Sequence, residues 1–245
     1  MSLPYVGVVV PAYNEESRLS KTLTRLKEYL DSTGWDWRVL VVSDGSEDRT
    51  VAIATEHSQR DPRITVTHYT PNRGKGCAVR TGMLELEAEW LLLCDADLAT
   101  PIEEVETLLG LGVPIAIGSR ALDRTRITHR QPWWREFAGR AFNAVLRMLA
   151  LPDLKDTQCG FKLFSGEAAK RVFSLCKMNG FSYDFEALMI ARSLGYRIAE
   201  VPVAWSHQEG SKVSLIRDGI RMLWDLVKLR VSLPGRIRAA RQGNS

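Results

Sequence analysis

Short apolar runs alternate with helical segments along this chain, and this alternation leaves few folds open to it. The runs are rich in β-branched and aliphatic residues, and their sequences are "YVGVVVP", "WRVLVVS", "RITVTHY", "EWLLLC" and "PIAIGS". Segments with helical spacing separate the first four runs, for example Leu19, Leu23, Leu26 and Leu30. Strands that are apolar along their whole length and are joined by helices indicate a mostly parallel sheet with both faces covered. The expected fold class is therefore α/β, of the Rossmann-like kind with helices flanking the sheet.

The pattern is less regular in the second half of the chain. The stretch "RALDRTRITHRQPWWREFAGR" is basic and aromatic, and it predicts a long loop that leads into a helix over about 135–150. "RIAEVPV" predicts a further strand. Helices are expected near 167–175, 183–194 and 213–231. The tail beyond Pro234 is expected to be flexible.

Composition narrows the classes of protein that this chain can represent. With 245 residues, 45% of them hydrophobic, the chain can bury a sizeable core, and its net charge of +4 is too mild to suggest nucleic acid as a partner. Its four cysteines form no CxxC pair, which argues against a zinc site and favours a reducing cytoplasm. The apolar run at the N-terminus has no basic residues before it, so we interpret it as a strand and not as a signal peptide. No apolar stretch approaches the roughly 18 residues that span a bilayer.

Four polar clusters follow the first four predicted strands directly. Their sequences are "PAYNEE", "SDGSEDRT", "NRGKG" and "DADLAT". Ligands of open parallel sheets bind at the carboxyl ends of the strands. We therefore expect the four clusters to meet along one rim of the sheet and to form the binding site.

Asp95 and Asp97 stand one residue apart where the fourth strand ends. Side chains alternate along an extended chain, so both carboxylates face the same side and repel each other unless a cation lies between them. Carboxylate oxygens suit Mg²⁺ or Mn²⁺, either of which is the expected cofactor. Two solvated aspartates are the alternative interpretation. A phosphatase motif would need threonine where the chain has Ala99, and a dinucleotide site would need G-x-G-x-x-G after the first strand.

The second and third clusters supply further candidates. A carboxylate at Asp44, in a loop that opens a helix, can accept a hydrogen bond from a nucleobase, or it can act only as a helix N-terminal charge. "NRGKG" offers Gly74 and Gly76 for close backbone approach and Lys75 for charge, although a plain turn with an exposed lysine is the alternative.

These motifs, in this order, resemble family 2 glycosyltransferases of the GT-A fold. "VVVPAYNEE", "VVSDGSEDRT", "NRGKGCAVRTGM" and "LLLCDADLATP" are similar to the nucleotide-binding half of that family. "DTQCGFKLF", "FSYDFEAL" and "VPVAWSHQEGSKVS" resemble its dolichyl-phosphate β-glucosyltransferase branch, with the dolichyl-phosphate mannosyltransferases as close relatives. The resemblance covers about residues 5–232, and the form "DADxAT" favours the glucosyl branch.

The resemblance implies transfer of a hexose from a UDP- or GDP-activated sugar to a polyprenyl phosphate, with inversion. Glucose is the expected transferred sugar and UDP-glucose its donor, and GDP-mannose is the alternative donor. By position, the residues implied in nucleotide binding are Pro11, Tyr13, Glu15, Asp44, Lys75 and Asp95. The same resemblance implies that Asp95 and Asp97 hold the metal and the diphosphate, and that Arg120 reaches the phosphates. A nucleotide-binding protein without catalysis is disfavoured, because both aspartates are present and have no evident structural task.

The acceptor decides which other residues the reaction needs. A phosphate monoester has a second pKa of about 6, so it is mostly dianionic at neutral pH and needs cations more than a base. Arginines are frequent over 120–140 and stand beside two tryptophans, as expected near lipid headgroups, although a solvated basic loop is the alternative. The residues expected to bind the acceptor phosphate are Arg130, Arg135 and Lys212. A hydroxyl acceptor would instead need a general base, for which the candidates are Asp156, Asp184 and Glu186, with one of the last two expected at the surface. The catalytic candidates are therefore Asp97, Arg120, Asp156 and Asp184.

The last predicted helix is the part of the chain that we expect to contact a membrane. One stripe of it carries Ile216, Ile220, Leu223, Val227 and Val231, with seven Lys or Arg against two Asp over 213–241. A basic amphipathic helix of this kind can lie in an anionic membrane surface, although the same stripe could pack against the core. We expect a peripheral protein on the cytoplasmic face of a membrane, and the sequence predicts no oligomeric state.

Three segments make up the expected domain organisation. A single GT-A catalytic domain is expected over 1–212. Its nucleotide-binding half covers about 1–118 and its acceptor half about 119–212. The amphipathic helix and basic tail cover 213–245.

Overall fold

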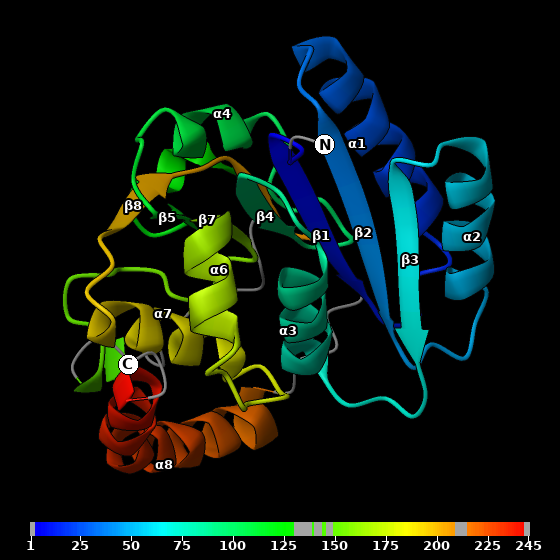
Figure 1. Ribbon diagram of the computed structural model, residues 1–245. Helices are drawn as coiled ribbons and strands as arrows, with labels where there is room; N and C mark the ends of the chain where they lie inside the picture. The colour runs from blue at the N-terminus through cyan, green and yellow to red at the C-terminus, as the bar shows by residue number, and fades with distance from the viewer. Residues whose placement is uncertain (1–2, 130–138, 140–143, 146–148, 209–214, 243–245) are drawn as a thin grey trace.

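A seven-stranded sheet forms the centre of the computed structural model, which describes residues 3–129, 139, 144–145, 149–208 and 215–242 (Figure 1). The strand order is β3-β2-β1-β4-β7-β5-β8. The strands are β1 (Val6–Ala12), β2 (Trp37–Asp44), β3 (Ile64–Tyr69), β4 (Trp90–Cys94), β5 (Ile115–Ser119), β7 (Phe161–Ser165) and β8 (Ile198–Pro202). Two short strands, β6 (Ile127–His129) and β9 (Trp205–Ser206), pair with each other outside this sheet.

The sheet is mostly parallel, as the sequence predicts. β1 pairs in parallel with β2 and β4, and β5 pairs in parallel with β8. β7 is the exception, because it runs antiparallel between β4 and β5. This strand is not predicted from the sequence, since Lys162 interrupts its apolar pattern. The structure buries Lys162 in the sheet by pairing it with Asp184.

Helices cover both faces of the sheet (Figure 1). Alternate residues of β1 show why, because Val8 and Val10 belong to the apolar cluster under α1 and α4, whereas Val9 belongs to the cluster under α3, α6, α7 and α8. The helices are α1 (Leu19–Thr33), α2 (Thr50–Arg60), α3 (Lys75–Glu85), α4 (Glu104–Leu109), α6 (Gly166–Phe173), α7 (Tyr183–Ser193) and α8 (Leu215–Gln242). The helix predicted over about 135–150 lies mostly outside the described residues.

α8 is longer than predicted and continues through Pro234 to Gln242. The expectation of a flexible tail is therefore wrong as far as that residue. A proline inside a helix removes one backbone hydrogen bond. Buried contacts on both sides of it offset this loss, because Leu233 and Ile237 pack into the core and Arg236 pairs with Glu186.

The apolar stripe predicted on α8 is its exposed face. Ile220 is 64% exposed, Val227 51% and Val231 80%, so core packing of this stripe is excluded for its described members. A second stripe, offset around the helix, packs into the core instead: Met222, Leu226, Leu229, Leu233 and Ile237. No helix in the described part of the chain is both long enough and apolar enough to cross a membrane.

Candidate active site

The loops after β1 and β2 are joined by hydrogen bonds, so the first two polar clusters meet as predicted. The backbone N–H of Glu15 donates to Thr50 Oγ1 at 2.7 Å, and that of Glu47 donates to Asn14 Oδ1 at 2.8 Å. Asn14 has a φ of 51°, a left-handed conformation that asparagine tolerates better than most residues. Much of the polarity in "PAYNEE" and "SDGSEDRT" therefore holds the two loops in place.

The Asp44 carboxylate, at the end of β2, holds the third cluster. Its Oδ1 accepts from Tyr69 Oη and the Arg73 N–H, both at 2.8 Å. Its Oδ2 accepts from Asn72 Nδ2 and the Gly74 N–H, both at 2.9 Å. A carboxylate has about four lone-pair sites, so the chain itself uses the capacity of this buried group. Asp44 thus positions the turn that opens α3, and its contact with a nucleobase remains a prediction.

Lys75, the first residue of α3, reaches the fourth cluster. Its Nζ lies 2.6 Å from Asp95 Oδ1. Burial opposes the charge of Lys75, but the Asp95 and Asp184 carboxylates outweigh that effect and raise its pKa. The third and fourth clusters are therefore adjacent, and Lys75 carries a positive charge at the rim of the sheet.

Asp97 is the second carboxylate of the acidic pair. Its Oδ1 accepts from the Ala99 N–H at 3.0 Å. Burial raises the pKa of Asp97, and repulsion from Asp95 adds to the shift. Asp95 thus lies close enough to disfavour the charge of Asp97, and a shared cation would relieve this repulsion.

The donor set at this pair suits a divalent cation such as Mg²⁺ or Mn²⁺. Among the described residues there is no group of three or more His, Cys, Asp or Glu that could hold a metal. Asp95 and Asp97 are the ligands that these described residues would supply, and water and a bound diphosphate would complete the set. Magnesium sites in nucleotide-dependent enzymes have this composition.

A hollow beside Asp95 contains a residue that the sequence analysis does not identify, Trp205. The lining residues are Cys94, Asp95, Leu98, Ala99, Thr100, Gly160, Phe161 and Trp205. The next residue along the chain, Ser206, donates its N–H to Ala99 O at 2.8 Å, which holds the Trp205 segment on the acidic turn. Trp205 lies more than 100 positions from Asp95, so no local pattern connects them.

Gly160 allows the Asp95 carboxylate to lie against β7. A Cβ atom built on Gly160 would stand 2.0 Å from Asp95 Oδ2. No side chain can share that space, so the glycine of "DTQCGFKLF" is required by the acidic pair and not by a turn.

Arg120 is held by Asp156 in a bidentate ion pair. Arg120 Nε lies 2.6 Å from Asp156 Oδ2, and Nη2 lies 2.8 Å from Oδ1. Burial alone would raise the pKa of Asp156, but the Arg120 charge and hydrogen bonds outweigh it and lower that pKa to about 2. The Arg120 guanidinium also lies 5.6 Å from the centre of the Trp205 ring, which places it near the hollow. Asp156 therefore positions Arg120 and is a poor proton acceptor at neutral pH.

Asp184 and Glu186 are both buried, which corrects the expectation that one of them is a surface charge. Lys162 Nζ donates to Asp184 Oδ1 and to the Cys159 carbonyl. Burial raises the pKa of Asp184, while the Lys162 and Lys75 charges act against that shift. Glu186 accepts from two backbone N–H groups and from Arg236.

The remaining predicted residues fall into two groups. Pro11 lies near the end of β1, where it pairs with Val42 of β2, and Tyr13 and Glu15 follow on the loop. Glu15 Oε2 forms an ion pair with Arg18 Nε at 2.8 Å. The residues predicted to bind the acceptor phosphate lie outside the described residues: Arg130, Arg135 and Lys212.

The order of the sheet and the acidic pair after β4 define an α/β protein of the GT-A class. The chain belongs to glycosyltransferase family 2, because the family model described as "Glycosyl transferase family 2" matches its residues 7–173. It is therefore a glycosyltransferase, and the family predicted from the motifs is confirmed.

Curated relatives resemble the chain over most of its length. It is 38% identical to the dolichyl-phosphate beta-glucosyltransferase of Mus musculus over 243 residues, covering 92% of this chain and 75% of the relative. It is 36% identical to the dolichyl-phosphate beta-glucosyltransferase of Homo sapiens, again covering 92% of this chain and 75% of the relative. With dolichyl-phosphate beta-glucosyltransferase ALG5A of Trichomonas vaginalis it is 36%, covering 93% of this chain and 73% of the relative.

Solved structures show the same fold. Glucosyl-3-phosphoglycerate synthase from Mycobacterium tuberculosis, in complex with UDP, matches with a TM-score of 0.65 at 20% identity, covering 92% of this chain and 79% of that one. The same synthase with Mn²⁺ and UDP-glucose matches with a TM-score of 0.63 at 19% identity, covering 96% and 79%. Mannosyl-3-phosphoglycerate synthase from Rubrobacter xylanophilus matches with a TM-score of 0.66 at 17% identity, covering 95% and 75%.

Proposed function

We propose that this protein transfers glucose from a nucleotide sugar, with UDP-glucose the expected donor, to dolichyl phosphate or another polyprenyl phosphate. The similarity to dolichyl-phosphate beta-glucosyltransferases over more than nine tenths of the chain supports this acceptor and this sugar. The UDP and UDP-glucose complexes of proteins with the same fold are in line with the donor.

The observation that carries the proposal is the pairing of all three candidate bases with cations. A hydroxyl acceptor needs a base to remove its proton, whereas a phosphate dianion does not. Asp156 is bound by Arg120, Asp184 by Lys162, and Glu186 by Arg236. A paired cation weakens a carboxylate as a base, so these pairings favour a phosphate acceptor.

The chain's own cations suit the departure of a nucleoside diphosphate. Cleavage of the bond between the sugar and the diphosphate leaves negative charge on the diphosphate. Lys75 lies at the rim of the sheet beside Asp95, and Arg120 lies near the same hollow, so both can stabilise that charge. Mg²⁺ or Mn²⁺, held by Asp95 and Asp97, would supply further charge neutralisation when bound.

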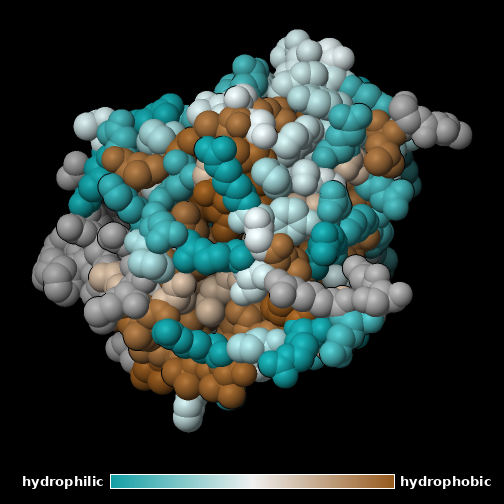
Figure 2. Space-filling view, turned by 60° about the vertical axis from the view of Figure 1, so that its left-hand side comes forward, coloured by the Kyte–Doolittle hydropathy of each residue, from teal (hydrophilic) through white to brown (hydrophobic). Residues whose placement is uncertain are grey.

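We also propose that α8 lies on an anionic lipid surface through its exposed apolar face. Figure 2 shows apolar side chains along the bottom of the molecule, where Figure 1 places α8. This lipid-facing stripe consists of Ile220, Leu223, Trp224, Val227 and Val231, all exposed. Exposed cations accompany it on the same helix: Arg221, Lys228, Arg230 and Arg238. Apolar area combined with positive charge favours an anionic membrane over a second protein.

The location that we propose is peripheral, on the cytoplasmic face of a membrane. All four cysteines are buried and unbridged, which is in line with a reducing compartment. Flotation with vesicles tests the surface contact: we expect binding to vesicles that contain an anionic phospholipid and little binding to purely zwitterionic ones. Equal flotation with both, or none with either, would contradict the proposed charge complementarity.

A transfer assay tests the reaction. The purified chain is incubated with Mn²⁺ or Mg²⁺ and a short-chain polyprenyl phosphate, with radiolabelled UDP-glucose or GDP-mannose as donor. We expect glucose to enter the organic phase, and we expect EDTA to abolish the transfer. Matched reactions with the corresponding polyprenol, which has a hydroxyl in place of the phosphate, should give no product. Transfer to the alcohol, or from GDP-mannose only, would contradict the proposal.

A further inference from the structure

We propose that Glu186 and Arg236 are positioning residues through which α8 holds the turn that carries Lys75. This inference rests on the proposed function in one respect, because it assigns Lys75 to the donor site. No local sequence signal connects the basic tail with that turn. The connection follows from contacts that run through one buried carboxylate.

Glu186 is that carboxylate, and it lies on α7 without any exposed surface. Its oxygens accept from the backbone N–H of Lys177 at 3.0 Å and of Met178 at 2.8 Å. Arg236 Nη1, from the last turns of α8, lies 2.6 Å from Glu186 Oε1. The carboxylate therefore joins α8 to the segment 177–180.

The segment 177–180 lies directly against the turn that opens α3. The Cys77 N–H is 3.3 Å from Asn179 O. A Cβ atom on Gly74 would stand 2.4 Å from Asn179 O, and one on Gly76 would stand 2.5 Å from Met178 O. Backbone packs on backbone here, with no side chain between the two segments. A shift of 177–180 must therefore move the residues on either side of Lys75.

α8 also holds the beginning of α7 by a second contact. Ser182 Oγ donates to Asp225 Oδ2 at 2.6 Å. The segment between α6 and α7 is thus fastened to α8 near residue 182 and again through Glu186. Because the other face of α8 carries the lipid-facing stripe, one helix connects the proposed membrane surface with the proposed donor turn.

The buried ion pair of Glu186 and Arg236 is better suited to positioning the 177–180 backbone than to stabilising the fold. Two charges lose much of their hydration when they are buried, so a buried pair is weak evidence for a stabilising role. Its hydrogen bonds are directional, however, and they define where the 177–180 backbone lies. Loss of Arg236 should therefore displace the turn that carries Lys75 more than the same substitution at an exposed ion pair would.

Hydrogen–deuterium exchange of the full chain without ligand tests this role. Arg236→Met keeps the aliphatic volume, and we expect it to raise the exchange rate of amides over 74–80 about tenfold, while amides of β1 and β2 exchange as in wild type. Arg236→Lys should restore most of the protection, because it retains a donor of positive charge. The matched control is Arg171→Met, which breaks an exposed arginine–glutamate pair with Glu167 on α6.

Steady-state kinetics give the second readout. We expect Arg236→Met to raise the KM for UDP-glucose about tenfold and also to lower kcat, because a displaced Lys75 binds the donor less well and stabilises the leaving diphosphate less. Glu186→Gln keeps an acceptor for the backbone N–H groups and should give a smaller increase. Unchanged exchange over 74–80 in Arg236→Met, with a lowered melting temperature, would overturn the inference and leave a purely structural pair. If the wild-type chain neither binds UDP-glucose nor transfers sugar, the proposed function fails, and the exchange experiment still decides this inference.

Discussion

Asp97, Asp156 and Asp184 differ in what each carboxylate contacts. Asp156 and Asp184 are each paired with a cation, Arg120 and Lys162 respectively. Asp97 instead accepts a backbone hydrogen bond. Burial raises the pKa of both Asp97 and Asp184, but the next effect at Asp97 is repulsion from Asp95, whereas at Asp184 it is the opposing charge of Lys162. Of the three, Asp97 is therefore the carboxylate that gains most from a bound divalent cation.

The substitution Asp97→Asn keeps the shape and the acceptor for the Ala99 N–H but removes the charge. We expect kcat to fall about 10²- to 10³-fold, because charge stabilisation of the leaving diphosphate is lost. Titration with Mn²⁺, followed by electron paramagnetic resonance, should show weaker metal binding. Asp153→Asn, at an exposed ion pair with Arg192, is the control and should behave as wild type. Unaltered Mn²⁺ affinity in Asp97→Asn would remove this residue from the metal site.

Gly160→Ala probes the space next to Asp95. The new Cβ would stand 2.0 Å from Asp95 Oδ2, so the carboxylate must rotate away. We expect transfer activity to fall about 100-fold with the fold retained, since a small misplacement of a reacting group has effects of that order. Gly235→Ala on α8 meets open space and serves as the control. Activity of Gly160→Ala close to wild type would show that Asp95 tolerates another position.

At the scale of elements, α8 carries two apolar stripes with different tasks. Leu226 is buried in the core, whereas Trp224 and Val231 are 64% and 80% exposed. We expect the double variant Trp224→Glu/Val231→Glu to lose flotation with anionic vesicles and to keep the melting temperature of wild type, because both side chains are mostly exposed. Leu226→Glu should instead unfold the chain or α8, since it buries an unpaired charge. A lower melting temperature in the double variant would indicate that the exposed stripe is covered by protein.

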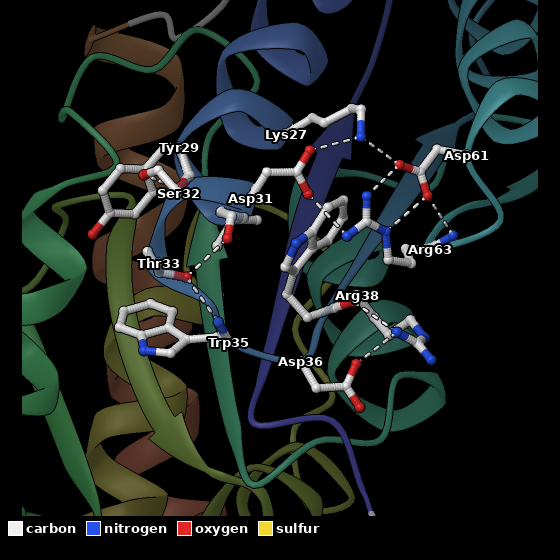
Figure 3. A network of polar contacts seen from close by, with 12 residues as sticks. Lys27, Tyr29, Asp31, Ser32, Thr33, Trp35, Asp36, Arg38, Asp61 and Arg63 are labelled. Atoms are coloured by element: carbon white, nitrogen blue, oxygen red, sulfur yellow. Dashed lines mark hydrogen bonds and ion pairs between the residues drawn. The ribbon is translucent and has the colours of Figure 1, made fainter.

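At the scale of the whole molecule, a charged network holds the end of the sheet opposite the site (Figure 3). Asp61 accepts from Arg63 and from Lys27, which joins α1 to the connection between α2 and β3. The Arg63 guanidinium lies 3.9 Å from the centre of the Trp37 ring at the start of β2. The Arg63 hydrogen bonds, with help from Lys27, hold the pKa of Asp61 well below its ordinary value of 3.8.

This network predicts a component of acid sensitivity. A carboxyl group whose pKa is lower in the folded state stabilises the protein above its unfolded pKa, and this stabilisation is lost as the pH falls below about 4. We expect Asp61→Asn to lower the free energy of unfolding by about 1–2 kcal/mol at neutral pH, because its partners Lys27 and Arg63 are partly exposed. The difference from wild type should shrink towards pH 2.

Urea denaturation of both proteins at several pH values measures this effect. Asp36→Asn, at the exposed pair with Arg38 in the same view, is the control and should change the free energy of unfolding by less than about 0.5 kcal/mol. A constant difference between Asp61→Asn and wild type from neutral pH to pH 2 would contradict the assigned pKa shift.

From its residue patterns alone, the sequence predicts the α/β class, the four strand-end clusters and the acidic pair. These are local patterns, because burial on both faces makes a strand apolar and the carboxyl ends of parallel strands share one rim. It did not predict β7, whose buried Lys162 needs Asp184, 22 positions further along the chain, to be tolerated in the sheet.

Long-range packing decides which charges meet and which face of α8 is exposed. Asp156 and Glu186 belong to no local motif that names a partner. Arg120 binds Asp156 from 36 positions away, and Arg236 binds Glu186 from 50 positions away, so residue spacing cannot reveal either pair. Both stripes of α8 are apolar enough to be buried. The choice between them depends on which one meets α7 and the core, and that contact forms only when distant segments pack together.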